Sequence, residues 1–365
     1  MRTLHIEMGR NRLGGTMQTF YLARGLVEKG IDVKIVCPYG SPLHKLSVEN
    51  NIGVLPVKYL GDLDLTFIFK VYYFSIIYKP DIIHIHSRRG ADTLGLIGAW
   101  LFSKSKIIVS RRVDDPLPQN FFTKLRYQKI PDCVIAVSKG IKNVLIKSGI
   151  DGKKIKQIYS SIEIKKYQSD KSKDFCRNIL NIDNDCNVIV VIAQLIKRKG
   201  HNFLLDAIPT IINSNKNTKF LFVGEGKERE SIQGRIKELN LQDHVFLLGY
   251  KDNIADILKA SDILVHPATM EGFANVALQA MASELPVVSS AVGGMPESVR
   301  NQVNGLTIPP ANPGRLAEAI LFLLANPQVR AEMGRRGREI VEQEFTVDIM
   351  VEKIREVYVE LLSGK

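Results

Sequence analysis

A single stretch of the chain decides the fold class: Ile263-Leu-Val-His-Pro-Ala-Thr-Met-Glu-Gly-Phe-Ala-Asn-Val-Ala-Leu-Gln-Ala-Met-Ala-Ser-Glu-Leu-Pro-Val-Val-Ser-Ser290. It begins and ends with short apolar runs, Ile263–His266 and Val287–Ser290, which are typical of buried strands. A helix is expected from about Asn275, after a loop that contains glycine. Strand, helix and strand in this order predict a βαβ unit of a parallel sheet.

The same alternation extends in both directions along the chain. On the C-terminal side it predicts strands at Val188–Ala193, Phe220–Gly224 and Val245–Leu248, helices at Asn202–Asn213 and Lys227–Leu239, and a helical tail in at least two pieces from Pro313. On the N-terminal side it predicts strands at Leu4–Glu7, Val33–Cys37, Ile82–His86, Ile107–Ser110, Cys133–Val137 and Gln157–Glu163, and a helix at Thr16–Lys29.

A polar, Lys-rich linker at Lys165–Lys173 separates the two halves. The chain of 365 residues is too long for one ordinary core. We therefore expect an α/β protein with two doubly wound, Rossmann-like domains, residues 1–165 and 166–345, and a final helix over residues 346–365 that packs back toward the first domain. Ligands of such domains bind at the carboxyl ends of the strands.

The composition is that of a soluble globular protein, with 45% hydrophobic and 24% charged residues. No apolar run reaches the roughly 20 residues that a membrane-spanning helix needs. The first residues are typical of a strand that enters a loop, and not of a signal peptide. The four cysteines form no CxxC pair, so we expect free thiols in a cytoplasmic protein.

Positive charge is concentrated in the N-terminal half. Residues 1–163 carry 25 Lys and Arg against 13 Asp and Glu, whereas the rest of the chain is neutral. This excess suits an anionic partner such as a membrane surface or a lipid pyrophosphate, although a solubilising Lys-rich surface would look the same. Nucleic acid is not expected, because the basic residues are dispersed. The aromatic run at residues 67–79 fits a membrane-lying helix or, as we prefer, a buried Rossmann helix.

The loop before Asn275 carries the first candidate site. Its backbone N–H groups, over Gly272, Phe273, Ala274 and Asn275, could cradle a diphosphate at the positive end of the helix. Glu271 beside them could accept hydrogen bonds from sugar hydroxyls, or it could merely cap its own helix.

A basic turn, Gln194-Leu-Ile-Lys-Arg-Lys-Gly-His201, follows the first strand of the second domain. Arg198 or Lys199 could neutralise a departing nucleoside diphosphate there, whereas the alternative is a solvated basic turn. Gly224, in Val223-Gly-Glu-Gly, would permit close approach of the backbone to a ligand, but a lone GxG is a weak signal.

Three strand exits in the first domain carry further candidates. Gly14 and Gly15 allow the loop in Met8-Gly-Arg-Asn-Arg-Leu-Gly-Gly-Thr16 to bend toward a ligand. His84 and His86, in His84-Ile-His-Ser-Arg-Arg89, lie on one face of a strand. They could be metal ligands, but the sequence indicates no third one, so we expect no metal. Arg112 lies at another exit, among four charged residues.

Several segments, in this order and spacing, carry a resemblance over nearly the whole chain: Leu13-Gly-Gly-Thr, Pro80-Asp-Ile-Ile-His-Ile-His, Ala136-Val-Ser-Lys, the basic turn, Val223-Gly-Glu-Gly, Ala260-Ser-Asp-Ile-Leu-Val-His-Pro, Glu271-Gly-Phe, Gly293-Gly-Met-Pro-Glu and Asn304-Gly-Leu. Together they resemble the retaining GT-B glycosyltransferases of family 4, the group 1 glycosyltransferases of bacterial polysaccharide synthesis.

The resemblance implies a role for each candidate. The C-terminal domain would bind a sugar nucleotide, with a UDP-sugar expected, through Lys199, Arg198, Glu271, Gly224 and the segment Gly272–Asn275. The N-terminal domain would bind a lipid-linked, lipopolysaccharide or capsule glycan through Gly14, Gly15, His86 and Arg112. Such enzymes retain the anomeric configuration and use neither metal nor cofactor. The enzyme would be cytoplasmic, and peripheral on the inner face of the plasma membrane if it meets lipid.

Three positions depart from the family pattern. Gln279 stands where a second Glu is usual, eight residues after Glu271, and helical spacing would place the two on one face, where Gln279 could bind a ribose. Gln194 replaces a usual Arg, and Arg112 falls near a usual acceptor-side His. Two other readings share the fold: a sugar-nucleotide 2-epimerase, and a catalytically degenerate sugar-nucleotide or glycan-binding protein.

Overall fold

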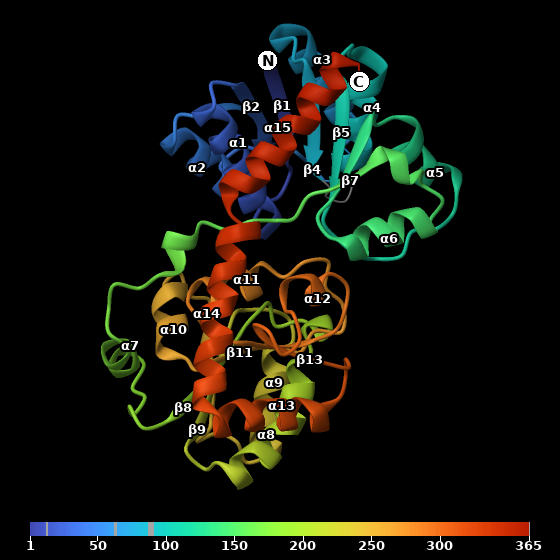
Figure 1. Cartoon of the computed structure of the whole chain (residues 1–365). Helices are drawn as coiled ribbons and strands as arrows, with labels where there is room; N and C mark the ends of the chain where they lie inside the picture. Colours follow the sequence, from blue (N-terminus) through green and yellow to red (C-terminus); the bar gives the residue numbers. More distant parts are fainter. Residues whose placement is uncertain (12–13, 62–63, 87–90, 365) are drawn as a thin grey trace. The chain divides into compact units, whose positions relative to one another are not determined.

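The computed structural model describes residues 1–11, 14–61, 64–86 and 91–364. The chain forms two compact units. The first consists of Met1–Ser161 together with Val347–Lys365, and the second of Ile162–Thr346. The predicted first domain ended at residue 165, so the observed unit is slightly shorter, and the final helix belongs to it (Figure 1).

The first unit is a parallel sheet covered by helices. The strand order is β3-β2-β1-β4-β5-β6-β7. The strands are β1 (Arg2–Ile6), β2 (Asp32–Pro38), β3 (Gly53–Val57), β4 (Ile82–His86), β5 (Lys106–Arg111), β6 (Cys133–Ala136) and β7 (Ile155–Gln157). The helices are α1 (Gly14–Glu28), α2 (Pro42–Glu49), α3 (Thr66–Tyr78), α4 (Ala91–Phe102), α5 (Phe121–Lys124), the π-helical turn η1 (Leu125–Lys129), α6 (Lys139–Lys147), the 3₁₀ turn η2 (Gly152–Lys154) and α15 (Val347–Ser363).

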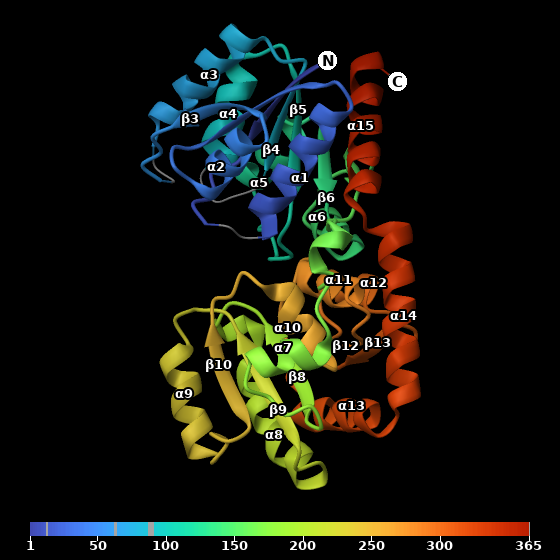
Figure 2. The same cartoon turned by 90° about the vertical axis from the view of Figure 1, so that its left-hand side faces the viewer.

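The second unit repeats this architecture around a parallel sheet of order β10-β9-β8-β11-β12-β13 (Figure 2). The strands are β8 (Asn187–Ile192), β9 (Thr218–Val223), β10 (Val245–Gly249), β11 (Ile263–His266), β12 (Val287–Ser290) and β13 (Gly305–Ile308). The helices and helical turns are η3 (Ile164–Tyr167), α7 (Lys173–Ile179), η4 (Lys197–Lys199), α8 (His201–Ser214), α9 (Arg229–Glu238), α10 (Ile254–Ala260), α11 (Asn275–Ala282), α12 (Met295–Ser298), α13 (Pro313–Ala325) and α14 (Pro327–Glu344).

The central strands are buried on both faces because helices cover both faces of each sheet. In β8 the run Val188–Val191 is fully buried, and β11 and β12 are buried along their whole length. The predicted α/β class and the two Rossmann-like halves are therefore confirmed.

Helix α15 is built into the first unit by contacts with α1 and the sheet. A Cβ on Gly25 of α1 would lie 2.6 Å from a methyl group of Val351, so glycine lets the two helices approach without displacing that side chain. The hydroxyl of Tyr358 lies 2.6 Å from Nδ1 of His84 in β4, and both side chains are fully buried. A buried pair of this kind keeps each polar group satisfied and fixes the helix on the sheet.

Most predicted elements match within a few residues, and the exceptions are local. The strand expected at Gln157–Glu163 is wrong, because β7 ends where that segment begins. The linker Lys165–Lys173 is partly helical, since η3 begins one residue before it and ends at Tyr167. Strands β3 and β13 were not predicted; β3 contains Pro56, which interrupts a strand pattern and is tolerated at the edge of a sheet.

Candidate functional site

Each sheet has one point at which the strand order reverses. It lies between β1 and β4 in the first unit and between β8 and β11 in the second. At such a point neighbouring loops leave the sheet on opposite sides, so a crevice opens at the carboxyl ends of the strands. The candidate residues predicted from the sequence lie mainly on loops at these two points.

In the second unit, Gly200 brings the loops after β8 and β11 together. It has a φ of 72°, and a Cβ there would lie 1.9 Å from the carbonyl oxygen of Pro267. No other residue fits, because the added methyl group would overlap the neighbouring backbone. Across this approach Thr269 donates its N–H to the carbonyl of Arg198 at 2.9 Å, and Nη1 of Arg198 reaches the carbonyl of Met270 at 3.4 Å.

Lys199 and Glu271, from these two loops, form an ion pair. The ammonium group of Lys199 donates to Oε2 of Glu271, and only 13% and 11% of the two side chains are exposed. The same oxygen accepts a hydrogen bond from Nε2 of His266 at 3.0 Å. Lys199 is therefore not a solvated side chain of a basic turn.

His266 is a residue that the sequence analysis missed as part of the site. It ends β11, five residues before Glu271, and only its place at a strand exit signalled it. Burial lowers the pKa of His266, so its imidazole stays neutral and donates Nε2–H to the carboxylate. Burial by itself would raise the pKa of Glu271, but the hydrogen bond from His266 and the charge of Lys199 outweigh it and hold this pKa well below its usual range.

The N-terminus of α11 lies just after Glu271 in the chain. Its N-cap residue Ala274 supplies no side-chain acceptor, and the Glu271 carboxylate bonds to Lys199 and His266, so the helix-capping alternative is not what the structure shows. Gly272, Phe273 and Ala274 are buried. Oδ1 of Asn275 is buried with no hydrogen-bond partner among the described residues. A helix start with this composition suits an anionic ligand.

Gly224 and Gln279 complete the predicted donor-side set. Gly224 has a φ of 141°, and a Cβ there would lie 2.0 Å from the carbonyl oxygen of Ala193, so glycine is required where β9 leaves the sheet. Nε2 of Gln279 donates to the hydroxyl of Tyr167 at 3.0 Å. Gln279 and Glu271 do not share a helical face, contrary to the prediction, because Glu271 lies in the loop before α11.

In the first unit, three of the predicted residues lie together. Nη2 of Arg112, just after β5, lies 3.1 Å from Nδ1 of His86 at the end of β4. A Cβ on Gly15 would lie 3.4 Å from Cδ of Arg112, so the first turn of α1, where Gly14 is the first residue, is next to the guanidinium stem. Leu13 and Ser87–Arg89, which the sequence motifs also contain, lie outside the described residues.

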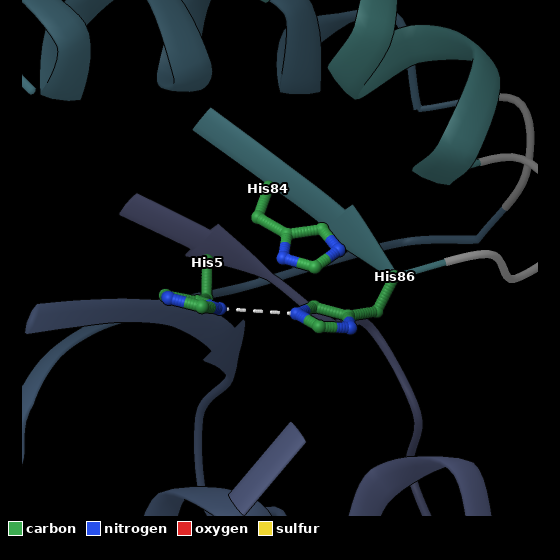
Figure 3. A group of neighbouring side chains, drawn as sticks. All are labelled: His5, His84 and His86. Carbon is green, nitrogen blue, oxygen red and sulfur yellow. Dashed lines mark hydrogen bonds between the residues drawn. The ribbon is translucent and has the colours of Figure 1, made fainter. Parts of the chain in front are cut away.

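A histidine from the neighbouring strand extends this group, as Figure 3 shows. Nδ1 of His5 in β1 lies 3.1 Å from Nε2 of His86. A guanidinium only donates, so His86 must accept at Nδ1 and carry its proton on Nε2, which then donates to His5. Burial lowers the pKa of His5 to about 3 and holds the pKa values of His84 and His86 well below 6.5, so all three rings are neutral.

His5 is a possible third ligand beside His84 and His86, which the sequence pattern does not indicate. One nitrogen of each ring lies within 4.8 Å of the others, a spacing that could hold a metal ion. His5 carried no sequence signal, because only the register of β1 on β4 places it opposite His84. His84 is already engaged by the hydroxyls of Tyr358 and Ser110, and Arg112 adds positive charge beside His86, which a cation would oppose.

These neutral histidines predict that the protein loses stability in mild acid. Their folded-state pKa values lie below the unfolded value near 6.5, so the unfolded chain binds more protons once the pH falls below it. We expect the free energy of unfolding to fall by as much as about 1.4 kcal/mol per pH unit for each histidine. Urea unfolding between neutral pH and about pH 5 measures this slope. His5→Asn should make the slope shallower, and a slope equal to that of the parent protein would contradict the assignment.

Comparison with known proteins adds to this geometry. Residues 14–166 match the model of "Glycosyltransferase Family 4", and residues 172–340 match that of "Glycosyl transferases group 1". An uncharacterized glycosyltransferase of Methanocaldococcus jannaschii is 32% identical over an alignment of 290 residues that covers 77% of this chain and 76% of the relative. The chain belongs to the group 1 and family 4 glycosyltransferases.

Other similarities of this glycosyltransferase extend over its full length. A capsular polysaccharide biosynthesis glycosyltransferase of Staphylococcus aureus is 26% identical, with 92% of this chain and 93% of the relative covered. The crystal structure of the Anabaena protein HepE in complex with UDP has a TM-score of 0.88 at 21% identity, covering 99% of this chain and all of the other. The predicted GT-B fold is thereby confirmed.

Proposed function

We propose that this glycosyltransferase moves a sugar from a UDP-sugar to a lipid-linked, lipopolysaccharide or capsule glycan, with retention of the anomeric configuration. The second unit would bind the donor and the first the acceptor. The observation that carries the proposal is the buried group of Lys199, Glu271 and His266 beside the uncapped start of α11. The UDP in the HepE structure and the capsular role in the name of the S. aureus relative support this choice of donor and acceptor.

The chemistry follows from the charges of these side chains. Lys199 and Arg198 would hold the diphosphate and stabilise its charge as the bond from the anomeric carbon to the diphosphate oxygen breaks. The acceptor hydroxyl oxygen bonds to the anomeric carbon on the same face, and its proton passes to the departing diphosphate oxygen. Glu271 would bind the donor sugar, where a carboxylate stabilises the positive charge that builds on the ring.

A thermal-shift panel of sugar nucleotides tests the donor. A ligand that binds only the folded state stabilises it by about 2.7 kcal/mol at a hundred times its Kd, so the preferred nucleotide should raise the melting temperature most. A UDP-sugar should do so, whereas a larger shift with GDP- or ADP-sugars would contradict the proposed base. If incubation with the donor alone changed the sugar without an acceptor, the enzyme would instead be a 2-epimerase.

We also expect transfer to need no metal ion. Lys199 and Arg198 supply positive charge where the diphosphate would lie, which is the role that a divalent cation plays in other transferases. Transfer from the UDP-sugar should therefore keep its rate in excess EDTA. Loss of activity with chelator, followed by rescue with manganese or magnesium, would contradict the metal-free mechanism.

A further inference from the structure

Helix α3 carries a row of large apolar side chains that the fold leaves outside. Leu65, Phe69, Tyr73 and Ile77 follow one another at intervals of four residues, so they lie on one side of the helix. With Ile76 beside them, these side chains are 48% to 66% exposed. An exposed apolar row of this kind on a globular unit indicates a surface that meets a partner.

The opposite side of α3 packs into the core of the first unit. Phe67, Val71, Ser75 and Tyr78 are buried there, and α4 packs closely beside the helix. A Cβ on Gly98 of α4 would lie 2.7 Å from the carbonyl oxygen of Ile68, so glycine allows the two helices to approach. The preferred prediction of a buried Rossmann helix is therefore correct for one face of α3 only.

Helix α4 adds two exposed apolar residues in its last turn. Trp100 and Leu101 are 52% and 51% exposed. With the outer row of α3 they form what we call the α3–α4 face, which consists of Leu65, Phe69, Tyr73, Ile76, Ile77, Trp100 and Leu101. Tyr and Trp in such positions are typical of the boundary between lipid and water, where the ring meets apolar chains and its polar atom stays hydrated.

The two segments that form the α3–α4 face carry basic side chains and no acidic ones. Residues 65–80 and 93–113 contain no acidic residue, and exposed lysines, Lys58, Lys79 and Lys104, flank the two helices. Lys70 on α3 pairs with the buried Asp64. The first unit as a whole, residues 1–161 and 347–365, has 28 Lys and Arg against 16 Asp and Glu, whereas residues 162–346 have 22 of each.

We propose that the α3–α4 face binds the surface of a bilayer that contains anionic lipids. The apolar row would enter the boundary region while the lysines remain among the phosphate groups. No helix among the described residues is long and apolar enough to cross the membrane. This inference rests on the proposed function insofar as a lipid-linked acceptor would be found at such a surface.

The chain contains one tryptophan, Trp100, so its fluorescence reports on this face alone. With vesicles of phosphatidylcholine and phosphatidylglycerol we expect a blue shift of the emission and quenching by brominated lipid chains. Vesicles of phosphatidylcholine alone should give at least about tenfold weaker binding, because they lack the anionic charge that attracts the lysines. Equal binding to both kinds of vesicle, or binding to neither, would overturn the proposal.

A matched pair of triple variants tests the residues. Phe69→Ser, Tyr73→Ser and Ile77→Ser together should weaken vesicle binding at least about tenfold, since three apolar side chains no longer enter the boundary region. The control combines Phe322→Ser, Tyr250→Ser and Ile179→Ser, the same residue types at exposed positions of the second unit, and should bind as the parent does. Equal losses of vesicle binding in the two triple variants would overturn the proposal. Concentration-dependent dimerisation of the parent that the first variant abolishes would also overturn it, because the face would then join two copies of the chain.

The melting shift with UDP, recorded for the same variants, separates the two proposals. If UDP still stabilises the first triple variant while vesicle binding is lost, the variant is folded and the face is confirmed as a lipid-binding surface. If the parent binds vesicles but transfers no sugar, the proposed function fails and the membrane face stands.

Discussion

Lys199→Ala is expected to weaken UDP binding by about ten- to hundredfold, as loss of one charge-assisted contact costs about 1.5–3 kcal/mol. The ammonium group of Lys199 lies at the β8–β11 switch point with its counterion, Glu271, and little of it is exposed. A diphosphate that binds there therefore meets a positive charge already held in place. Isothermal titration calorimetry with UDP measures the change.

Two controls make this result specific. Lys197→Ala removes an exposed lysine from the same turn, η4, and should leave the affinity for UDP unchanged. Arg112→Ala should also leave it nearly unchanged and should impair use of the acceptor. Equal losses of UDP affinity in Lys199→Ala and Arg112→Ala would show that the roles of the two units are assigned wrongly.

Lys199→Ala should also destabilise the second unit. It leaves the buried Glu271 carboxylate with only the hydrogen bond from neutral His266, and removal of one partner of a buried ion pair typically costs about 3–5 kcal/mol. Calorimetry therefore has to be carried out below the melting temperature of the variant, which is recorded beside it. An unchanged melting temperature would contradict the burial of this pair.

Glu271→Gln is expected to lower kcat by roughly a hundredfold or more, the effect of removing one charge-stabilising contact from an active site. The amide keeps the shape of the side chain and can still accept from His266, so the fold should survive. The affinity for UDP should stay the same or rise, because no carboxylate then neutralises Lys199 and its full positive charge is available to attract the diphosphate. Steady-state kinetics together with calorimetry separate the two effects.

Glu225→Gln is the matched control for this variant. Glu225 lies just after β9 on the same edge of the sheet, but it is exposed and pairs with Arg229 at 3.2 Å. The kcat of the Glu225→Gln variant should equal that of the parent enzyme. If Glu271→Gln retained full turnover, the carboxylate would have no part in the chemistry, and the pair with Lys199 would serve only to stabilise the fold.

The sequence predicted the sheets and the strand exits well because both depend on local patterns. Buried strands such as β8 and β11 are apolar runs, and a charged or glycine residue after such a run must lie at the carboxyl edge. Lys199 and Glu271 were identified in this way, although they are far apart in the chain.

Contacts that depend on strand register or on packing between distant segments could not be predicted from local sequence patterns. His5 meets His86 only because β1 lies on β4 in a particular register, and His84 meets Tyr358 only because the last helix returns to the first unit. His266 was read simply as the end of a strand, since its partner Glu271 is fixed by the path of a loop. Helical spacing could not place Gln279 relative to Glu271, because α11 begins only at Asn275 and Glu271 lies before it.

The return of α15 to the first unit has a consequence for synthesis on the ribosome. The nascent chain cannot complete its first unit until the last residues, Val347–Ser363, have emerged. The second unit is continuous, and its two ends are joined by the bridge between Ile162 and Thr346, so it can fold earlier as an insertion. A gene fragment that stops after Ser161 would lack Tyr358, one of the two hydroxyl partners of His84, and would leave α1 without the helix that packs on it. Expression of the first unit alone therefore requires α15 to be fused behind Ser161, whereas Ile162–Thr346 can be excised as one segment.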